Sequence, residues 1–462
     1  MDYSGKKVVI MGLGLNGGGL ESARFFLKRG AGVTVTDLRD EKVLQPSIKQ
    51  LDGKTVRYVL GRHEIEDFKK ADIVIKNPGV RPDSPFLQAA KQIETDISLF
   101  LAESPARLFA VTGTKGKSCT ASALYHILNN VKNNGKAFLG GNITVSPLTF
   151  LDELTGDDNV VLELSSFQLG DLKDRPLKPC AAVLTAIMAD HQDRYKSMEE
   201  YIDDKRNIYR GQDKDGITVA SDDSWGKSFH AESKARPLVY SHNTLQEGIN
   251  GGWLSGGGPA FARLTNWEGV SGEIEALVPS RLLTPGEHQK INLLSAALAV
   301  YGFGIKAKDI HDSLASFHGV EHRLEMFHTA GGVRFYNDSA ATIPEAAAAC
   351  IEALSAEGPL VLVTGGTDKN LDFSPLVKTA GKAAFIILLE GSGSEKLLRL
   401  LDENGIGYSG PFDNLEKAVC CAVEKAAKGS IVALSPGCAS FGMFLNEFDR
   451  GRKWKDAVVR MA

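Results

Sequence analysis

Two glycine-rich loops in this sequence have the spacing of segments that bind phosphate groups. The first is Gly12-Leu13-Gly14-Leu15-Asn16-Gly17, which follows an apolar, strand-like segment and precedes the helical pattern Leu20–Arg29. Asp37 ends the next apolar segment, where an acidic residue can bind a ribose hydroxyl. Glycines let backbone N–H groups approach a diphosphate at a helix N-terminus, so the loop predicts a diphosphate ligand. NAD, FAD and a UDP-sugar all fit this pattern, and a tight packing turn is the non-functional alternative.

The second loop is Thr112-Gly113-Thr114-Lys115-Gly116-Lys117-Ser118, between a strand pattern and an amphipathic helix pattern. Backbone amides of such a loop surround phosphate oxygens, Lys117 can offset the charge of the β- and γ-phosphates, and the Ser118 hydroxyl can bind Mg²⁺. The first glycine of the general Walker pattern would fall at Val111, so the match is incomplete. We predict ATP binding here. A redox enzyme has no obvious use for a second nucleotide loop, whereas an ATP-driven ligase would use both.

Three further side chains have types suited to metal or proton chemistry. Glu163 ends an apolar strand pattern, where a carboxylate faces the ligand crevice of an α/β sheet and can bind Mg²⁺. His191 follows another apolar segment, within Asp190-His191-Gln192-Asp193-Arg194. Taken alone, Glu163 would be a solvated charge and His191 a structural histidine. Lys205, in a helical segment, would by composition be a surface lysine.

Length and composition limit the kind of protein that these loops serve. The 462 residues are 43% hydrophobic and 24% charged, an ordinary globular balance that suits about three domains. With 53 basic and 57 acidic residues the net charge is −4, so we expect no nucleic-acid partner. The longest apolar segment is interrupted at Ser295, Gly302 and Gly304, which makes it too short for a membrane span. The six cysteines lack Cys-x-x-Cys spacing and the N-terminus lacks a signal-peptide pattern, so we expect a cytoplasmic enzyme with reduced thiols.

The elements that must position these residues alternate between short β-rich runs and helical patterns, which predicts an α/β protein. Three blocks separate, at 1–104, 105–319 and 320–462. We expect a Rossmann-like N-terminal domain, a central P-loop ATPase-type domain with a mainly parallel sheet, and a Rossmann-like C-terminal domain. The less regular stretch 213–280 predicts β-hairpins inserted at the edge of the central domain. The expected strands are Lys7–Met11, Val33–Asp37, Thr55–Val59, Ile73–Lys76, Arg107–Thr112, Asn159–Leu164, Ala181–Thr185, Val333–Asn337, Leu360–Thr364, Phe385–Leu389 and Ile431–Ser435.

Together these motifs resemble the Mur ligase family, ATP-dependent enzymes that add amino acids to UDP-muramoyl peptides of the bacterial wall. The resemblance covers essentially the whole chain. The run Glu163-Leu164-Ser165-Ser166-Phe167-Gln168-Leu169 is similar to the branch of the family that adds D-glutamate. The other matching segments are Gly113–Ser118, Gly141–Ile143, Asp190–Arg194, Tyr201–Lys205, Gly286–Asn292, His322–Glu325, Asn337–Thr342, Asp372–Leu376 and Ser435–Ser440.

This resemblance implies a role for each matching side chain. The catalytic residues would be Lys117, Glu163, His191 and Lys205, with Lys205 carbamylated. The Mg²⁺ ligands would be Ser118, Glu163, His191 and Lys205. The ATP contacts would be Gly113, Thr114, Lys115, Gly116, Lys117, Ser118, Cys119, Asn292, Arg323 and Asp338. The UDP-substrate would contact Leu15, Asn16, Asp37, Arg39 and, at its muramoyl part, Asn142. The incoming D-glutamate would contact Thr342, Lys369, Ser440 and Phe441.

Some positions depart from the family pattern. Ala340 stands where a lysine usually follows Asn-Asp-Ser, Gln289 replaces an asparagine, and Ala186 occupies a place that is usually asparagine. Glu447-Phe448 reverses the usual aromatic-then-acidic order. None of these changes removes a predicted metal ligand or the phosphate-loop lysine.

The implied function is ATP-dependent, ADP-forming amide-bond formation in peptidoglycan precursor synthesis, and hence in cell-wall biogenesis, cell shape and cell division. ATP would phosphorylate the carboxylate of UDP-N-acetylmuramoyl-L-alanine, and the amine of D-glutamate would attack the acyl phosphate. The three blocks would bind the UDP-substrate, ATP and the amino acid in that order, and we expect a monomer. A Mur ligase for another amino acid, an NAD-dependent oxidoreductase and a non-catalytic UDP-sugar-binding regulator are the alternatives. The last two leave Lys117 and Glu163 unexplained.

Overall fold

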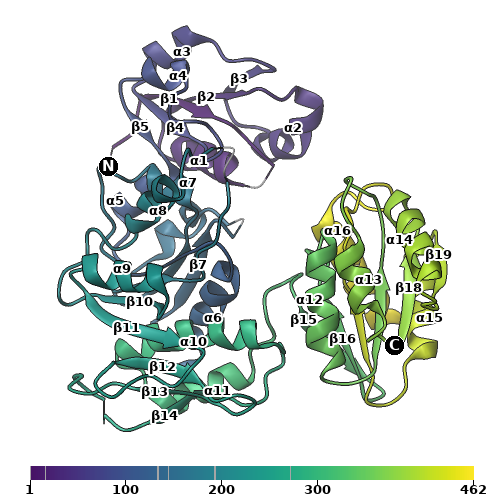
Figure 1. The fold of residues 1–462 in the computed structure, drawn as a ribbon. Helices are drawn as coiled ribbons and strands as arrows, with labels where there is room; N and C mark the ends of the chain where they lie inside the picture. The colour runs from purple at the N-terminus through teal and green to yellow at the C-terminus, as the bar shows by residue number, and fades with distance from the viewer. Residues whose placement is uncertain (1, 16, 133–134, 144, 192–193, 271) are drawn as a thin grey trace. The chain divides into compact units, whose positions relative to one another are not determined.

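The computed structural model describes residues 2–15, 17–132, 135–143, 145–191, 194–270 and 272–462. Its internal contacts divide the chain into two compact units, Met1–Ser280 with Ile291–Leu314, and Arg281–Lys290 with Ala315–Ala462. The first unit contains a five-stranded and a nine-stranded sheet, and the second contains a six-stranded sheet (Figure 1). The predicted α/β class with three parallel-rich sheets is confirmed. Each expected strand is present, with its ends shifted by one residue at most.

The N-terminal sheet is parallel and has the order β3-β2-β1-β4-β5. Its central strand β1 is apolar on both faces: Val8 and Ile10 pack into one buried cluster, and Val9 and Met11 into another. Helices can therefore cover both sides, as a parallel sheet requires. The strands are β1 (Lys7–Met11), β2 (Gly32–Asp37), β3 (Val56–Leu60), β4 (Ile73–Lys76) and β5 (Ile93–Glu94). The helices are α1 (Gly18–Lys28), α2 (Glu41–Ile48), α3 (Ile65–Lys70), α4 (Pro85–Gln88) and α5 (Asp96–Glu103).

The central sheet has the order β14-β13-β12-β11-β10-β9-β6-β8-β7, and its pairs from β7 to β12 are parallel. Strand β6 lies between β8 and β9, so the loop that follows β6 is at the middle of the carboxyl edge, where ligands of α/β sheets bind. The strands are β6 (Arg107–Thr112), β7 (Ala137–Gly141), β8 (Asn159–Glu163), β9 (Ala181–Leu184), β10 (Ile217–Ser221), β11 (Arg236–Ser241), β12 (Gly251–Leu254), β13 (Ala260–Arg263) and β14 (Glu275–Val278). The helices are α6 (Lys117–Asn130), α7 (Ser166–Gly170), α8 (Met198–Arg206), α9 (Ser224–Glu232), α10 (Glu287–Gly302) and α11 (Ala307–Ala315).

The prediction of hairpins throughout 213–280 is wrong for its first half. Strands β10 and β11 are parallel and are joined through helix α9, so this stretch continues the βαβ pattern of the central sheet. Only β12, β13 and β14 form an antiparallel edge. The helix between β10 and β11, α9, is preceded by the N-cap residue Asp223, whose carboxylate accepts from the N–H of Gly226.

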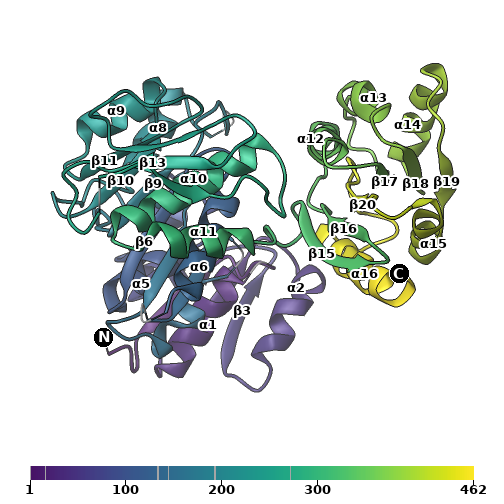
Figure 2. The same ribbon diagram turned by 90° about the horizontal axis from the view of Figure 1, so that it is seen from below.

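The second unit is an open sheet with the order β15-β16-β20-β17-β18-β19, in which only the edge pair β15–β16 is antiparallel. Alternate residues of its strands pack into two clusters, one with α12, α13 and α14 and one with α15 and α16, on opposite faces (Figure 2). The strands are β15 (Glu325–Ala330), β16 (Val333–Asn337), β17 (Leu360–Thr364), β18 (Phe385–Leu389), β19 (Ser409–Phe412) and β20 (Ile431–Leu434). The helices are α12 (Pro344–Ser355), α13 (Ser374–Ala380), α14 (Ser392–Glu403), α15 (Leu415–Lys425) and α16 (Glu447–Met461). Across the described residues, no helix is both long and apolar enough to cross a membrane.

Candidate active site

The second glycine loop joins β6 to the N-terminus of α6, and its glycines are required by space as well as by backbone angle. Gly113 has φ +145°, and a Cβ there would lie 1.9 Å from Thr185 Oγ1. Gly116 has φ +91°, and a Cβ there would lie 2.3 Å from Asn292 Oδ1. The Lys117 ammonium folds back over the loop and donates to the carbonyl of Thr114 at 2.9 Å. The loop thus presents helix N-terminal amides and a cation in one place, which suits a polyphosphate.

Glu163 ends β8, whose register places it level with Val111 of β6 and Gly141 of β7. Its side chain is buried, and Oε1 accepts a hydrogen bond from Asn142 Nδ2 at 3.0 Å. Oε2 is also buried but accepts no hydrogen bond from the residues that the structure describes. A buried carboxylate oxygen without a donor is unfavourable unless a cation or a water binds it, so this position fits Mg²⁺.

Lys205 is buried, which corrects its interpretation by composition as a surface lysine. Its ammonium donates to the carbonyl of Gly113 at 2.8 Å and lies 4.4 Å from the ring centroid of Tyr201. Burial, with a further contribution from the positive charge of Lys117, lowers the pKa of Lys205 to about 7, against the opposing charge of Asp190. A substantial fraction of this amine is therefore uncharged near neutral pH.

His191 follows β9 and has a left-handed backbone conformation, with φ +52°. Its backbone N–H donates to Asp190 Oδ1, and its ring lies 4.8 Å from the ring of Phe167. Gln192 and Asp193 lie outside the described residues. Within the described ranges, no three His, Cys, Asp or Glu side chains gather as a metal cluster. The predicted ligands thus do not form a closed cage, and Mg²⁺ commonly completes its shell with phosphate oxygens and water.

The remaining ATP contacts predicted near the second loop lie in or beside α6. Thr114 is buried, and its hydroxyl is 3.0 Å from the hydroxyl of Tyr201. Lys115 is exposed, Ser118 is half-buried and Cys119 is buried in the first turn of α6. Tyr201 is not among the residues predicted to contact a ligand, although its spacing of four from Lys205 puts both side chains on one face of α8.

The first glycine loop lies at the carboxyl edge of the N-terminal sheet, as predicted, and leads into α1. The carboxylate of Asp37 accepts from the N–H of Gly14 at 3.2 Å and from Arg39 Nη2 at 2.9 Å. Although burial opposes it, these hydrogen bonds hold the pKa of Asp37 below its usual range. Leu15 is exposed, and Asn16, the other predicted contact, lies outside the described residues. Asp37 and Arg39 thus form one charged group beside the loop.

In the second unit, the predicted ATP and amino-acid contacts follow neighbouring strands of the sheet. Asp338 follows β16, Lys369 follows β17, and Ser440 and Phe441 follow β20. A bridge between Thr367 and Ala439 ties the last two loops together. Thr342, which follows Asp338 in the chain, is half-buried, Arg323 and Lys369 are exposed, and Phe441 is 60% exposed.

Asp338 is buried in that unit. Its carboxylate accepts from Ser435 Oγ at 2.7 Å and from the N–H of Leu324 at 3.1 Å. Burial outweighs these hydrogen bonds and raises its pKa to about 7. Arg450 is a further residue of this region that the sequence pattern does not reveal. Its buried guanidinium donates to both the hydroxyl and the carbonyl of Ser339 and so fixes the residue after Asp338. An arginine inside an amphipathic helix gives no sequence signal for that contact.

The chain matches three models of known protein families along its length. These are a Mur ligase MurD-like N-terminal domain over residues 6–98, a Mur ligase middle domain over 111–300, and a Mur ligase glutamate ligase domain over 322–438. The chain belongs to the Mur ligase family. The predicted resemblance is confirmed, and with it the interpretation of the chain as an ATP-dependent ligase. The oxidoreductase alternative fails, because the whole chain matches a ligase family.

Individual Mur ligases agree with this assignment. The UDP-N-acetylmuramoylalanine–D-glutamate ligase of Treponema pallidum (strain Nichols) is 38% identical, covering 98% of this chain and 97% of that protein. The corresponding ligase of Borreliella afzelii (strain PKo) is 40% identical, covering 97% of each chain. Among solved structures, UDP-N-acetylmuramate–alanine ligase from Thermotoga maritima matches with a TM-score of 0.61 at 18% identity, over 99% of this chain and 100% of that one. The MurF ligase of the same organism, solved with ADP, matches with a TM-score of 0.55 at 18% identity, over 100% and 96%.

Proposed function

We propose that this Mur ligase joins D-glutamate to UDP-N-acetylmuramoyl-L-alanine, with hydrolysis of ATP to ADP and phosphate. The observation that carries the chemistry is the set of side chains around the second glycine loop. Glu163 Oε2, which accepts no hydrogen bond from the described residues, and the amine of Lys205 both lie beside this phosphate-binding loop. The amino acid is inferred from the near full-length similarity to ligases named for D-glutamate. We assign the UDP-substrate to residues 1–104, ATP to 105–319 and the amino acid to 320–462. A cytoplasmic location and a monomeric state stay predictions.

The residues of the central block have distinct tasks in the proposed reaction. The amides of the Gly113–Ser118 loop and the Lys117 ammonium would hold the polyphosphate and offset its charge as the γ-phosphoryl group leaves ATP. Glu163, Ser118 and His191 would hold Mg²⁺, which when bound supplies further positive charge at the phosphates. Asn142 keeps the Glu163 carboxylate oriented. Asn292 lies against Gly116 and would limit the depth of the phosphate site.

Lys205 fits this site in a modified form. A free ammonium next to a divalent cation would repel it, whereas the uncharged amine can add to CO₂ with loss of one proton. The carbamate that forms carries a negative charge in place of the positive one and offers oxygen ligands to Mg²⁺. The lowered pKa of Lys205 favours this step, because only the uncharged amine reacts.

The UDP-substrate contacts and the amino-acid contacts are proposed from the same reasoning. Leu15, Asn16, Asp37 and Arg39 would bind the UDP part, and Asn142 the muramoyl part. In the second unit, Arg323 and Asp338 would contact ATP, and the amino acid would meet Thr342, Lys369, Ser440 and Phe441.

A phosphate-release assay tests this function. With ATP, Mg²⁺ and UDP-N-acetylmuramoyl-L-alanine present, D-glutamate should stimulate release strongly, while L-glutamate, L-alanine and a diamino acid should not. Release stimulated best by a diamino acid would assign the chain to another Mur ligase activity. Binding of UDP-substrate without any ATP turnover would favour the non-catalytic regulator.

A further inference from the structure

A buried ion pair joins the N-terminal and central blocks of the first unit. Lys76 ends β4, directly before the turn Asn77-Pro78-Gly79-Val80. Its ammonium lies 2.6 Å from Asp171 Oδ2, on the residue that follows α7 in the central block. The two side chains are only 3% and 9% exposed, so water screens this pair very little.

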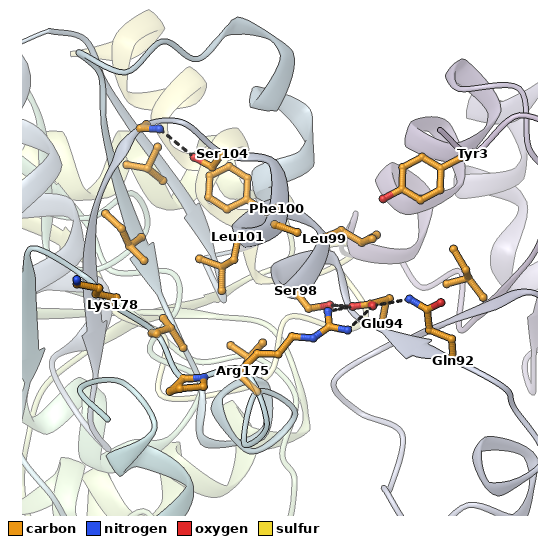
Figure 3. A pocket seen from close by; sticks show the side chains of 18 of the residues that line it. Tyr3, Gln92, Glu94, Ser98, Leu99, Phe100, Leu101, Ser104, Arg175 and Lys178 are labelled. Carbon is orange, nitrogen blue, oxygen red and sulfur yellow. Dashed lines mark hydrogen bonds and ion pairs between the residues drawn. The ribbon is translucent and has the colours of Figure 1, made fainter. Parts of the chain in front are cut away.

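A second ion pair joins the same two segments with its charges reversed. Glu94 of β5 is level with Ile75, the neighbour of Lys76, in the parallel β4–β5 pairing. Arg175, four residues after Asp171, donates to both oxygens of the Glu94 carboxylate, at 2.7 Å for Nη2. Figure 3 shows this carboxylate among its donors Arg175, Ser98 and Gln92, at the wall of a cavity of about 840 Å³ between the two blocks.

These two pairs, Lys76–Asp171 and Glu94–Arg175, are called here the interdomain clamp. In the N-terminal block the positive Lys76 lies next to the negative Glu94. In the central block the negative Asp171 faces Lys76 and the positive Arg175 faces Glu94. A sliding or tilting of one block against the other would bring like charges together or leave buried charges unpaired, and both are strongly unfavourable. The clamp therefore specifies one arrangement of the two blocks rather than simply adding attraction between them.

The central half of the clamp lies on the segment that follows Glu163 directly in the chain. The hydroxyl of Ser165 and the side chain of Gln168 form a capping box that begins α7 directly after Leu164. Asp171 is the C-cap residue of this one-turn helix. A shift of Asp171 is therefore transmitted to the end of β8, where the Glu163 carboxylate lies.

Arg194 binds the turn that follows Lys76 through a hydrogen bond to its backbone. Its guanidinium donates to the carbonyl of Pro78 at 3.3 Å and lies 3.8 Å from the ring centroid of Phe167 in α7. This arginine comes three residues after His191. The turn that follows Lys76 therefore contacts the segment that carries His191. Lys76 itself contacts Asp171, on the segment that follows Glu163.

We propose that Lys76 and Asp171 are positioning residues for the ligase reaction, which act by fixing the block that binds the UDP-substrate against the block that binds ATP. This inference rests on the proposed function, in which the substrate carboxylate is held by one block and the phosphoryl group by the other. In-line attack requires these groups to meet within a fraction of an ångström, and misplacement by about 1 Å can cost about a hundredfold in rate. Neither side chain is required to touch the reacting atoms.

The experiment compares Lys76→Met and Asp171→Asn with Lys28→Met. Lys28 also pairs across the two blocks, with Asp152 at 2.5 Å, but the two side chains are 69% and 45% exposed. We expect kcat per folded molecule to fall by about tenfold or more in the first two variants, with both KM values within about threefold. Lys28→Met should stay within about twofold, since an exposed pair contributes little. A rise in KM for the UDP-substrate without loss of kcat would overturn the proposal and make Lys76 a binding residue.

The double variant Lys76→Met with Asp171→Leu separates positioning from stability. It removes both buried charges, so its melting temperature should return toward that of the parent protein. The positioning role predicts that its kcat stays low. Recovery of kcat together with the melting temperature would show a merely structural role and overturn the proposal.

Hydrogen exchange on the ligand-free protein keeps the clamp testable whatever amino acid the enzyme adds. In Lys76→Met, the amides of Asn77, Gly79, Val80 and residues 163–170 should exchange about tenfold faster than in the parent, while Lys28→Met leaves them unchanged. Unchanged exchange in Lys76→Met overturns the proposal. A parent enzyme that ignores D-glutamate would overturn the proposed function alone, because the exchange result does not depend on it.

Discussion

Lys205 illustrates how its surroundings decide the chemistry of a side chain. Its sequence neighbours are polar and charged, and composition alone predicts a solvated ammonium. The carbonyl of Gly113 and the ring of Tyr201 instead enclose it, and its pKa falls to about 7. Gly113 is 92 positions earlier in the chain, so no local pattern contains this contact. Only the family resemblance pointed to Lys205, and its modification remains a prediction.

Replacement of Lys205 tests that prediction directly. Lys205→Ala should lower kcat by about a hundredfold or more, because the site loses a charged metal ligand. Formate should restore part of the activity by occupying the vacated oxygen position. Lys173→Ala is the matched control. Lys173 Nζ lies 3.0 Å from Oδ1 of Asp204, the residue directly before Lys205, but the Lys173 side chain is 54% exposed. Full activity of Lys205→Ala, with or without formate, would refute the carbamate.

The pH dependence of carbamate formation follows from the same pKa. Below about pH 7 the amine of Lys205 is mostly protonated and cannot add to CO₂, and above pH 7 it is mostly uncharged. Enzyme depleted of CO₂ should therefore regain activity more slowly at lower pH, by about tenfold per unit below pH 7 at a fixed CO₂ pressure. Recovery that is independent of pH between 5 and 8 would contradict the prediction.

At the scale of elements, the sequence predicted buried parallel strands best. Strands such as β6 and β17 are continuous apolar runs that end at glycines, because both of their faces are covered by helices. The stretch from β10 to β11 was misread because α9 is short and contains two aromatic residues, Trp225 and Phe229, that also suit a strand. The glycine loops were placed correctly, whereas the clamp depends on contacts between the ends of β4 and β5 and the distant residues 171–175, which follow α7.

The geometry of the phosphate loop gives a prediction about an element rather than a side chain. Gly116→Ala should weaken ATP binding by about tenfold or more, because a Cβ at 2.3 Å from Asn292 Oδ1 forces the loop or the Asn292 side chain to move. Gly248→Ala is the control: Gly248 has φ +87°, close to the +91° of Gly116, but a Cβ there would have no atom of the described residues within 4 Å. Calorimetry with an ATP analogue measures both. Equal losses of affinity would contradict the prediction, because Gly248 lies between β11 and β12, outside the phosphate loop.

At the scale of the whole molecule, the two glycine loops lie on different sheets of one unit, so their ligands should respond to different substitutions. Lys117→Ala should abolish phosphate release and weaken ATP binding while leaving affinity for the UDP-substrate nearly unchanged. Asp37→Ala should do the reverse and raise KM for the UDP-substrate with little change in KM for ATP. Isothermal titration of each variant with each ligand checks both halves. Loss of UDP-substrate binding in Lys117→Ala as large as its loss of ATP binding would contradict the assignment.

The position of β6 between β8 and β9 has a consequence for how the protein is made. The phosphate loop is synthesised before its neighbours Glu163, Thr185, Lys205 and Asn292, which leave the ribosome in that order. Residues 107–118 therefore acquire these neighbours one after another and lack the last of them until Asn292, in the second turn of α10, has been translated. Nascent chains arrested before Asn292 should fail to retain ATP on an affinity matrix, so during translation the nucleotide can stabilise the fold only at a late stage.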